Sequence, residues 1–168
     1  IGLIRRMCSF KIREIQPRDN QSVAKVIREV LVEMGVPKVG TAYEDKSLDD
    51  MFATYNNDKM KYFIVSEEGN IIGGAGIAPL TNGPDGICEL QKMYFLPVAR
   101  GRGIGAAMMN TCLHYAKSVG YNQSYLETMP YMEDARRLYS RSGFRSLDKP
   151  MGDTGHYNCT MWMIKDLE

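Results

Sequence analysis

The sequence predicts a mixed α+β fold, in which helices pack on a twisted, mostly antiparallel sheet. A length of 168 residues fits one domain of ordinary size. The middle of the chain has consecutive strand-like runs joined by short turns, and a later segment has the order strand, glycine-rich loop, long helix, strand. Because an antiparallel meander here leads into a β-α-β crossover, the sheet must contain strands of both orientations.

The first third of the chain is expected to contribute one strand and two helices. Residues 9–15 alternate apolar with charged side chains, the period of a half-buried strand. A turn at 17–20 opens a helix, because apolar residues then recur at helical spacing as far as Gly35. Ser47 and Asp50 form a capping-box pattern that predicts a second, short helix.

The middle of the chain is expected to form the meander and the longest helix. Residues 61–65 and 71–77 are strand-like and flank turn-forming residues, in the manner of a hairpin. A third strand-like run covers residues 87–96, and apolar spacing predicts a helix over 104–119. Three glycines within the second strand favour a bulge.

The last third of the chain predicts a further strand, helix and strand. Residues 124–128 and 160–164 are the strand-like runs, and the helix covers 133–142. A short strand is expected near Phe144. The complete prediction is a sheet of six or seven strands with about four helices.

Charge and hydropathy exclude several classes of partner. Lys and Arg number 21 against 20 Asp and Glu, which does not favour nucleic acid or an anionic membrane as the partner. No apolar run approaches the ~18 residues of a membrane span, and the first seven residues lack the apolar stretch of a signal peptide. We therefore expect a cytoplasmic protein whose domain spans residues 7–168, with residues 1–6 a leader or remnant.

Four scattered cysteines do not predict a metal site. Cys8, Cys88, Cys112 and Cys159 form no C-x-x-C pair, and only two histidines accompany them. We expect reduced cysteines, buried where they lie in apolar runs, and no bound metal.

The run Arg100-Gly-Arg-Gly-Ile-Gly105 is the strongest chemical signal. It lies between a strand and a helix, where glycines let a ligand approach the free N–H groups of the helix terminus. Two arginines add charges that suit phosphate oxygens. A nucleoside-triphosphate loop would need Lys and Ser or Thr after the last glycine, but Ala106 and Ala107 follow it. The loop therefore predicts a site for another kind of phosphate ligand.

A nicotinamide dinucleotide is one alternative for this loop. Gly101, Gly103 and Ala106 satisfy the G-x-G-x-x-A spacing, and Glu127 follows at about 20 residues. Against it, residues 97–100 separate the loop from its strand, and only 168 − 106 = 62 residues follow Ala106. That remainder is too short for a doubly wound sheet.

Two motifs together resemble the GNAT N-acetyltransferases, which transfer an acetyl group from acetyl-CoA to an amine. The run 100–105 matches the family's R/Q-x-x-G-x-G/A signature, and Ala135-Arg-Arg-Leu-Tyr-Ser-Arg-Ser-Gly-Phe144 matches its A-x-x-L-Y-x-x-x-G-F helix. The runs 89–94, 125–129 and 151–156 resemble a bacterial subgroup, some of whose members are fused to MarR-type regulators.

The resemblance implies a sheet splayed between the strands at 89–95 and 125–128, with the pantetheine arm of acetyl-CoA in the gap. An N–H group there, that of Met93 or Tyr94, would polarise the thioester carbonyl. Tyr139 would protonate or hydrogen-bond the departing sulfur. The implied cofactor-binding residues are Met93, Tyr94, Phe95, Arg100, Arg102, Gly103, Ile104, Gly105 and Ala106.

The acceptor amine must lose a proton before it attacks, so a base is needed. Strand alternation puts Glu89, Gln91 and Met93 on one face if no bulge intervenes, and Glu89 is then the preferred base. His156 and Glu127 are other candidates. For the acceptor site we expect Tyr43 and Glu44, beside Asp45, together with His156. The acidic side chains favour a cationic amine.

The function expected from all these features is transfer of an acetyl group to a primary amine of a small molecule or amino acid. A non-catalytic acyl-CoA sensor and a nicotinamide-dependent oxidoreductase remain as alternatives. Neither nucleic acid nor membrane is expected as a partner, and the protein would be a monomer or homodimer.

Overall fold

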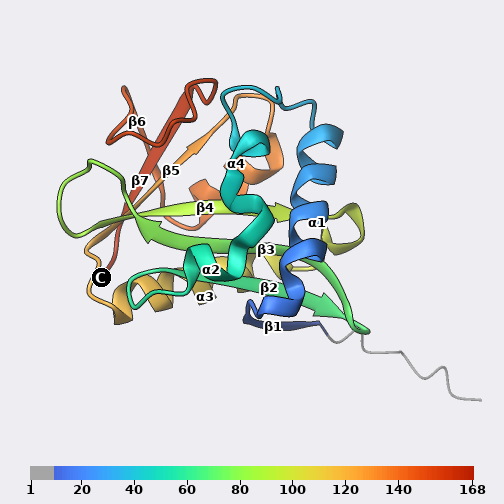
Figure 1. The fold of residues 1–168 in the computed structure, drawn as a ribbon. Helices are drawn as coiled ribbons and strands as arrows, with labels where there is room; N and C mark the ends of the chain where they lie inside the picture. Colours follow the sequence, from blue (N-terminus) through green and yellow to red (C-terminus); the bar gives the residue numbers. More distant parts are fainter. Residues whose placement is uncertain (1–9) are drawn as a thin grey trace, which may run out of the picture.

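The computed structural model describes residues 10–168, which form a sheet with helices on both faces (Figure 1). The predictions for residues 1–6, Cys8 and the start of the first strand lie outside these residues. The elements are β1 (Lys11–Glu14), α1 (Asn20–Glu33), α2 (Met51–Tyr55), β2 (Lys61–Glu67), β3 (Asn70–Pro79), β4 (Ile87–Phe95), α3 (Ile104–Ser118), β5 (Gln123–Thr128), α4 (Glu133–Arg141), β6 (Arg145–Leu147) and β7 (Met161–Asp166).

The seven strands found in residues 10–168 have the order β1-β2-β3-β4-β5-β7-β6. Strands β1 to β4 form the antiparallel meander, β5 runs parallel to β4, and β7 pairs antiparallel with both β5 and β6. This confirms the predicted mixed sheet. The short strand expected near Phe144 is β6, which starts at Arg145.

The two faces of the sheet have separate apolar cores. Helices α1 and α2 lie on one face, where Ile27 and Met51 pack against Ile64 of β2. Helix α3 lies on the opposite face, and its Met108 belongs to a core with Tyr139 of α4. In Figure 1, α1 and α2 pass in front of the meander and α3 lies behind it. The central strands are therefore buried on both sides, which leaves strand ends as places where a ligand can enter.

Strands β4 and β5 separate part of the way along their length. They pair only over Ile87–Glu89 of β4 and Gln123–Tyr125 of β5, although β4 continues to Phe95 and β5 to Thr128. The remaining halves of the two strands do not pair with each other. The splay that the family resemblance implied is thus present at the expected strands.

A bulge in β4 changes which side chains share a face. Gly74 pairs with Tyr94 and Gly76 with Gln91, so two residues of β4 lie opposite Ala75, and Lys92 has a φ of 50°. Past this extra residue the alternation of side chains is inverted.

The alternation predicted for Glu89, Gln91 and Met93 is therefore wrong at its last member. Gln91 accepts a hydrogen bond from Tyr55 of α2, whereas Met93 packs in the core of the α3 face. Tyr94 takes its place beside the core of α1 and α2. The physical reason is the extra residue of β4, which lies opposite the glycines of β3 and not within the glycine-containing strand where a bulge was expected.

Candidate active site

The glycine-rich loop leads directly into the N-terminus of α3. Gly103 adopts a φ of 76°, a conformation that glycine tolerates and other residues rarely adopt. A Cβ on Gly103 would meet no atom within 4 Å. The carbonyl of Gly103 accepts the first hydrogen bond of the helix, from the N–H of Ala107. Since the preceding N–H groups of a helix have no partner within it, this terminus presents donors beside an open surface.

The two arginines of the loop contact carboxylates. Arg100 forms a two-point contact with Glu33 of α1, at 2.6 and 2.8 Å, and donates to the carbonyl of Phe95 at 2.9 Å. Arg102 pairs with Glu67 of β2. Both guanidinium groups are thus held next to the helix terminus. A phosphate ligand would meet them there in competition with these carboxylates.

A narrow cavity of about 50 Å³ opens where β4 and β5 separate. Its walls come from both strands, from α4 and from three loops. It is lined by Val36, Thr41, Ala42, Glu89, Leu90, Gln91, Lys92, Met93, Tyr94, Leu126, Glu127, Thr128, Met129, Met132, Tyr139, His156 and Cys159. The structure therefore brings Met93, Tyr94, Glu89, Tyr139 and His156, all selected from the sequence, to one cavity.

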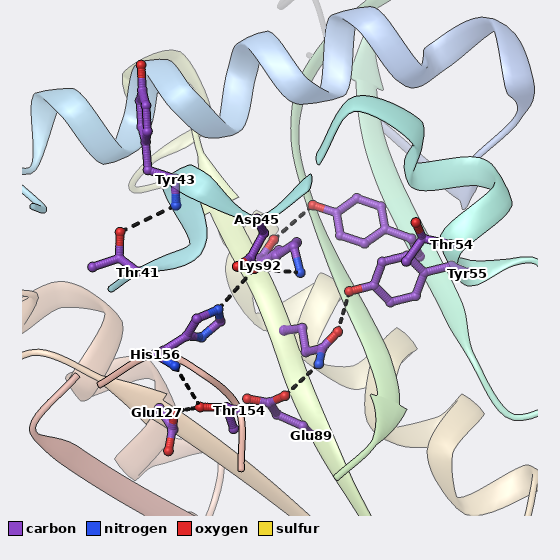
Figure 2. Close-up of polar contacts among 12 residues, drawn as sticks. Thr41, Tyr43, Asp45, Thr54, Tyr55, Glu89, Lys92, Glu127, Thr154 and His156 are labelled. Atoms are coloured by element: carbon purple, nitrogen blue, oxygen red, sulfur yellow. Dashed lines mark hydrogen bonds and ion pairs between the residues drawn. The ribbon is translucent and has the colours of Figure 1, made fainter. Parts of the chain in front are cut away.

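Glu89 is a buried carboxyl group on the cavity wall, with 5% of its surface exposed. Gln91 donates a hydrogen bond to Glu89, and Tyr55 in turn donates to Gln91, as Figure 2 shows. Burial raises the pKa of Glu89 above the ordinary value of a carboxyl group, although the bond from Gln91 opposes this. A carboxyl group with a raised pKa is better suited to accept a proton from an amine.

Glu127 and His156 lie next to Glu89. One ligand atom from each of the three side chains lies within 4.8 Å of the others. Glu127 accepts hydrogen bonds from Tyr125, at 2.6 Å, and from Thr154. Figure 2 shows Glu127 and Thr154 below the ring of His156. Two carboxylates so close together favour a cationic ligand.

Asp45 connects His156 to the opposite side of the site. Its carboxylate lies 2.9 Å from Nε2 of His156 and 3.4 Å from Nζ of Lys92. Burial lowers the pKa of His156, but the hydrogen bond and charge of Asp45 outweigh burial, and the pKa is raised. Burial likewise raises the pKa of Asp45, yet His156 and Lys92 hold it below its ordinary value.

Tyr139 and Cys159 supply a hydroxyl and a thiol to the same cavity. Tyr139 is 7% exposed, and its ring packs edge-on against Phe144 with the centroids 6.1 Å apart. Burial raises the pKa of Tyr139 to about 12 and that of Cys159 to about 12. Both groups therefore stay protonated near neutral pH, and Cys159 is a poor nucleophile there.

Two residues expected at the acceptor site do not line the cavity. The ring of Tyr43 points away from His156 (Figure 2) and lies near the cations of Arg28 and Lys38. The carboxylate of Glu44 accepts a hydrogen bond from the backbone of Gly40. Their neighbour Asp45 does not line the cavity either, but it contacts His156 and Lys92, which do.

Sequence reasoning also missed Lys92 and Thr154. Lys92 has a buried ammonium group because the bulge turns it toward Asp45. Thr154 contacts Glu127 from a loop without periodicity.

Within residues 10–168, no helix is both long and apolar enough to span a membrane.

The chain is similar to known N-acetyltransferases. The model of the acetyltransferase (GNAT) family matches residues 26–144. An uncharacterized N-acetyltransferase of Escherichia coli K12, YjgM, is 38% identical over 157 residues, which cover 93% of this chain and 94% of the relative.

Two solved structures have the same fold. A GNAT acetyltransferase from Staphylococcus aureus Mu50 superposes with a TM-score of 0.84 at 19% identity, over 95% of this chain and all of its own. A putative acetyltransferase from Salmonella typhimurium, YncA, solved with its cofactor acetyl-CoA, superposes with a TM-score of 0.74 at 16% identity, over 95% of this chain and 94% of its own.

The family match excludes the nicotinamide-dependent alternative for the glycine-rich loop, because the family is one of acetyltransferases. It also favours an enzyme over a sensor. The chain is an N-acetyltransferase, and it belongs to the acetyltransferase (GNAT) family.

Proposed function

We propose that this protein transfers the acetyl group of acetyl-CoA directly to a primary amine of a small molecule or amino acid. The observation that carries this proposal is the cavity between the separated halves of β4 and β5, which is lined by both Glu89 and Tyr139. A proton acceptor and a hydrogen-bond donor thus share the space in which an amine and a thioester would meet.

Acetyl-CoA would lie across the splay. Its pyrophosphate would bind at residues 102–106, where helix N–H groups, glycine access and arginine charge coincide. Its pantetheine arm would lie along Met93, Tyr94 and Phe95, the part of β4 that does not pair with β5. The acetyl-CoA bound to the Salmonella relative of the same fold supports this proposal.

The transfer would need no covalent intermediate on the protein. The amine nitrogen attacks the thioester carbon, and the carbon–sulfur bond then breaks with its electron pair on sulfur. A backbone N–H of Met93 or Tyr94 stabilises the developing oxyanion. Glu89 accepts the proton of the amine, and Tyr139 donates a hydrogen bond to the leaving thiolate. Holding the two reactants side by side supplies much of the rate enhancement.

A stopped assay with a panel of primary amines tests this proposal. We expect release of the CoA thiol that depends on the amine, with one acetylated amine, identified by mass spectrometry, for each thiol released. Protein incubated with acetyl-CoA alone should carry no acetyl group. Thiol release without an acylated amine, or an acetylated protein that passes its acetyl group to the amine, would contradict direct transfer.

Several finer expectations stay predictions. They are the resemblance to domains fused with MarR-type regulators, the cytoplasmic location, the monomeric or homodimeric state and the domain boundary at residue 7. The roles of Tyr43 and Glu44 in acceptor binding are not part of this proposal, because neither side chain lines the cavity.

A further inference from the structure

Glu89 of β4 and Glu127 of β5 are two neighbouring carboxylates on the wall of the cavity. They lie on the two strands that separate, and their oxygens lie within 4.8 Å of each other. Among the ion pairs of residues 10–168, neither carboxylate takes part. Like charges at this separation repel each other in a partly desolvated site.

The groups that orient these two carboxylates are neutral. Gln91 donates its amide N–H to Glu89, and the hydroxyls of Tyr125 and Thr154 donate to Glu127. Neutral donors fix the positions of the oxygens and do not offset their negative charge.

The nearby cations are directed elsewhere. His156 and Lys92 both contact the carboxylate of Asp45, at 2.9 and 3.4 Å. Asp45 offsets one of these two positive charges, and both cations also act on Glu89. Three carboxylates against two cations still leave the cavity with an excess of negative charge, on the side of Glu89 and Glu127.

We propose that the Glu89–Glu127 pair binds the ammonium group of the acceptor, so that the enzyme selects aliphatic primary amines, which are protonated at neutral pH, over arylamines, which are neutral. This inference rests on the proposed function. An ammonium group placed between the two carboxylates can donate to both and relieves their repulsion.

The two carboxylates would have different roles. Glu89 is the more buried and takes one proton from the ammonium group, which frees the lone pair for attack. Glu127 accepts a hydrogen bond from the nitrogen and holds it in place. A second proton leaves the nitrogen when the carbon–sulfur bond breaks, and it ends on the CoA thiolate. Glu89 then returns its proton to solvent, so the whole reaction releases one proton.

The test compares benzylamine with aniline at pH 7.5, because the first is a cation there and the second is neutral. The variant is Glu127→Gln, whose side chain keeps its shape and an oxygen to accept from Thr154 or Tyr125. We expect this variant to bind benzylamine about tenfold more weakly or worse. The loss should appear both in KM and in the Kd measured by calorimetry on the CoA complex. The KM and Kd for aniline should change less than about twofold.

Two controls separate this role from a structural one. Glu133→Gln removes an exposed carboxylate one residue after Met132 of the cavity wall and should leave both amines unchanged. Glu127→Asp keeps the charge and should recover part of the loss for benzylamine.

The inference is overturned if wild-type protein shows no preference for benzylamine over aniline, or if Glu127→Gln weakens both amines equally. It is also overturned if a chelator changes the benzylamine KM, because the pair would then hold a metal ion. Calorimetry separates this inference from the proposed function. Benzylamine binding that depends on Glu127, without acetyl transfer to any amine, would refute only the latter.

Discussion

Replacement of Tyr139 by Phe removes one hydroxyl from the cavity and leaves the aromatic packing on Phe144 in place. With the pKa of Tyr139 raised to about 12 by burial, full proton transfer to a thiolate whose conjugate thiol has a pKa of ~8.5 would be uphill by about 3.5 units, or ~5 kcal/mol. The hydroxyl therefore acts by hydrogen bonding. A hydrogen bond to a charged group contributes ~1.5–3 kcal/mol, so kcat should fall by about 10²-fold.

The assay for Tyr139→Phe measures thiol release at saturating amine, together with acetyl-CoA affinity by calorimetry, which should stay nearly unchanged. Tyr121→Phe is the matched control. Tyr121 is also buried with a pKa of about 12, but its hydroxyl bonds the carbonyl of Lys59 away from the cavity. That variant should lose stability and keep kcat. A kcat in Tyr139→Phe close to the wild-type value would refute the assigned role.

Three further predictions test the loop, the base and the cysteines. Gly103→Glu should abolish acetyl-CoA binding in calorimetry, because it forces a side chain into a φ of 76° and puts a negative charge at the helix terminus. The control Gly69→Glu, at a φ of 80° in a hairpin turn, should bind acetyl-CoA normally. Tight acetyl-CoA binding by the Gly103 variant would disprove the loop assignment. Glu89→Gln should lower kcat by about 10²-fold yet raise Tm at pH 7. The pKa of Glu89 is raised in the folded state, so the stabilising contribution of the protonated carboxyl group is lost as pH rises through the folded pKa. The Tm difference between variant and wild type should vanish below the pKa of Glu89 in the unfolded chain, and a lower Tm of the variant at pH 7 would contradict this reasoning. Replacement of all four cysteines by Ala or Ser should keep most of the turnover, because burial raises the pKa of Cys159 to about 12 and the mechanism uses no thiol of the protein; loss of kcat in a folded variant would refute direct transfer.

The order of elements was predictable because each element has a local signal. Apolar spacing over 104–119 marks α3, and its structure ends at Ser118. The last strand was less well defined, since the apolar pattern stops at Ile164 whereas β7 continues to Asp166. There Lys165 and Asp166 pair with β5 through the backbone, and backbone pairing does not require apolar side chains.

The site was predictable in part, for a reason that follows from distance along the chain. Glu89 and Tyr139 belong to elements with their own patterns or motifs. Asp45 and His156 come from two loops 111 residues apart, and neither loop has a period that reveals which side chains turn inward. Such contacts depend on tertiary structure. The chemistry of imidazole pointed to His156 and the acidic run pointed to residues 43–45, but neither signal showed that Asp45 and His156 contact each other.

The glycines of β3 connect the fold of the sheet with the arrangement of the site. A Cβ on Gly74 would lie 2.6 Å from the ring of Tyr62, so only glycine leaves room for that ring against the strand. The hydroxyl of Tyr62 donates to the carbonyl of Lys92, the residue of the bulge with a φ of 50°.

The close approach of Tyr62 thus supports an extra residue in β4, and that residue decides what faces the cavity. Without it, Lys92 would share a face with Leu90 and pack toward α3. With it, Lys92 turns toward Asp45, and Tyr94 joins the face of Gln91 and Glu89. Small residues in β3 therefore control the arrangement of charge in a site to which they contribute no side chain.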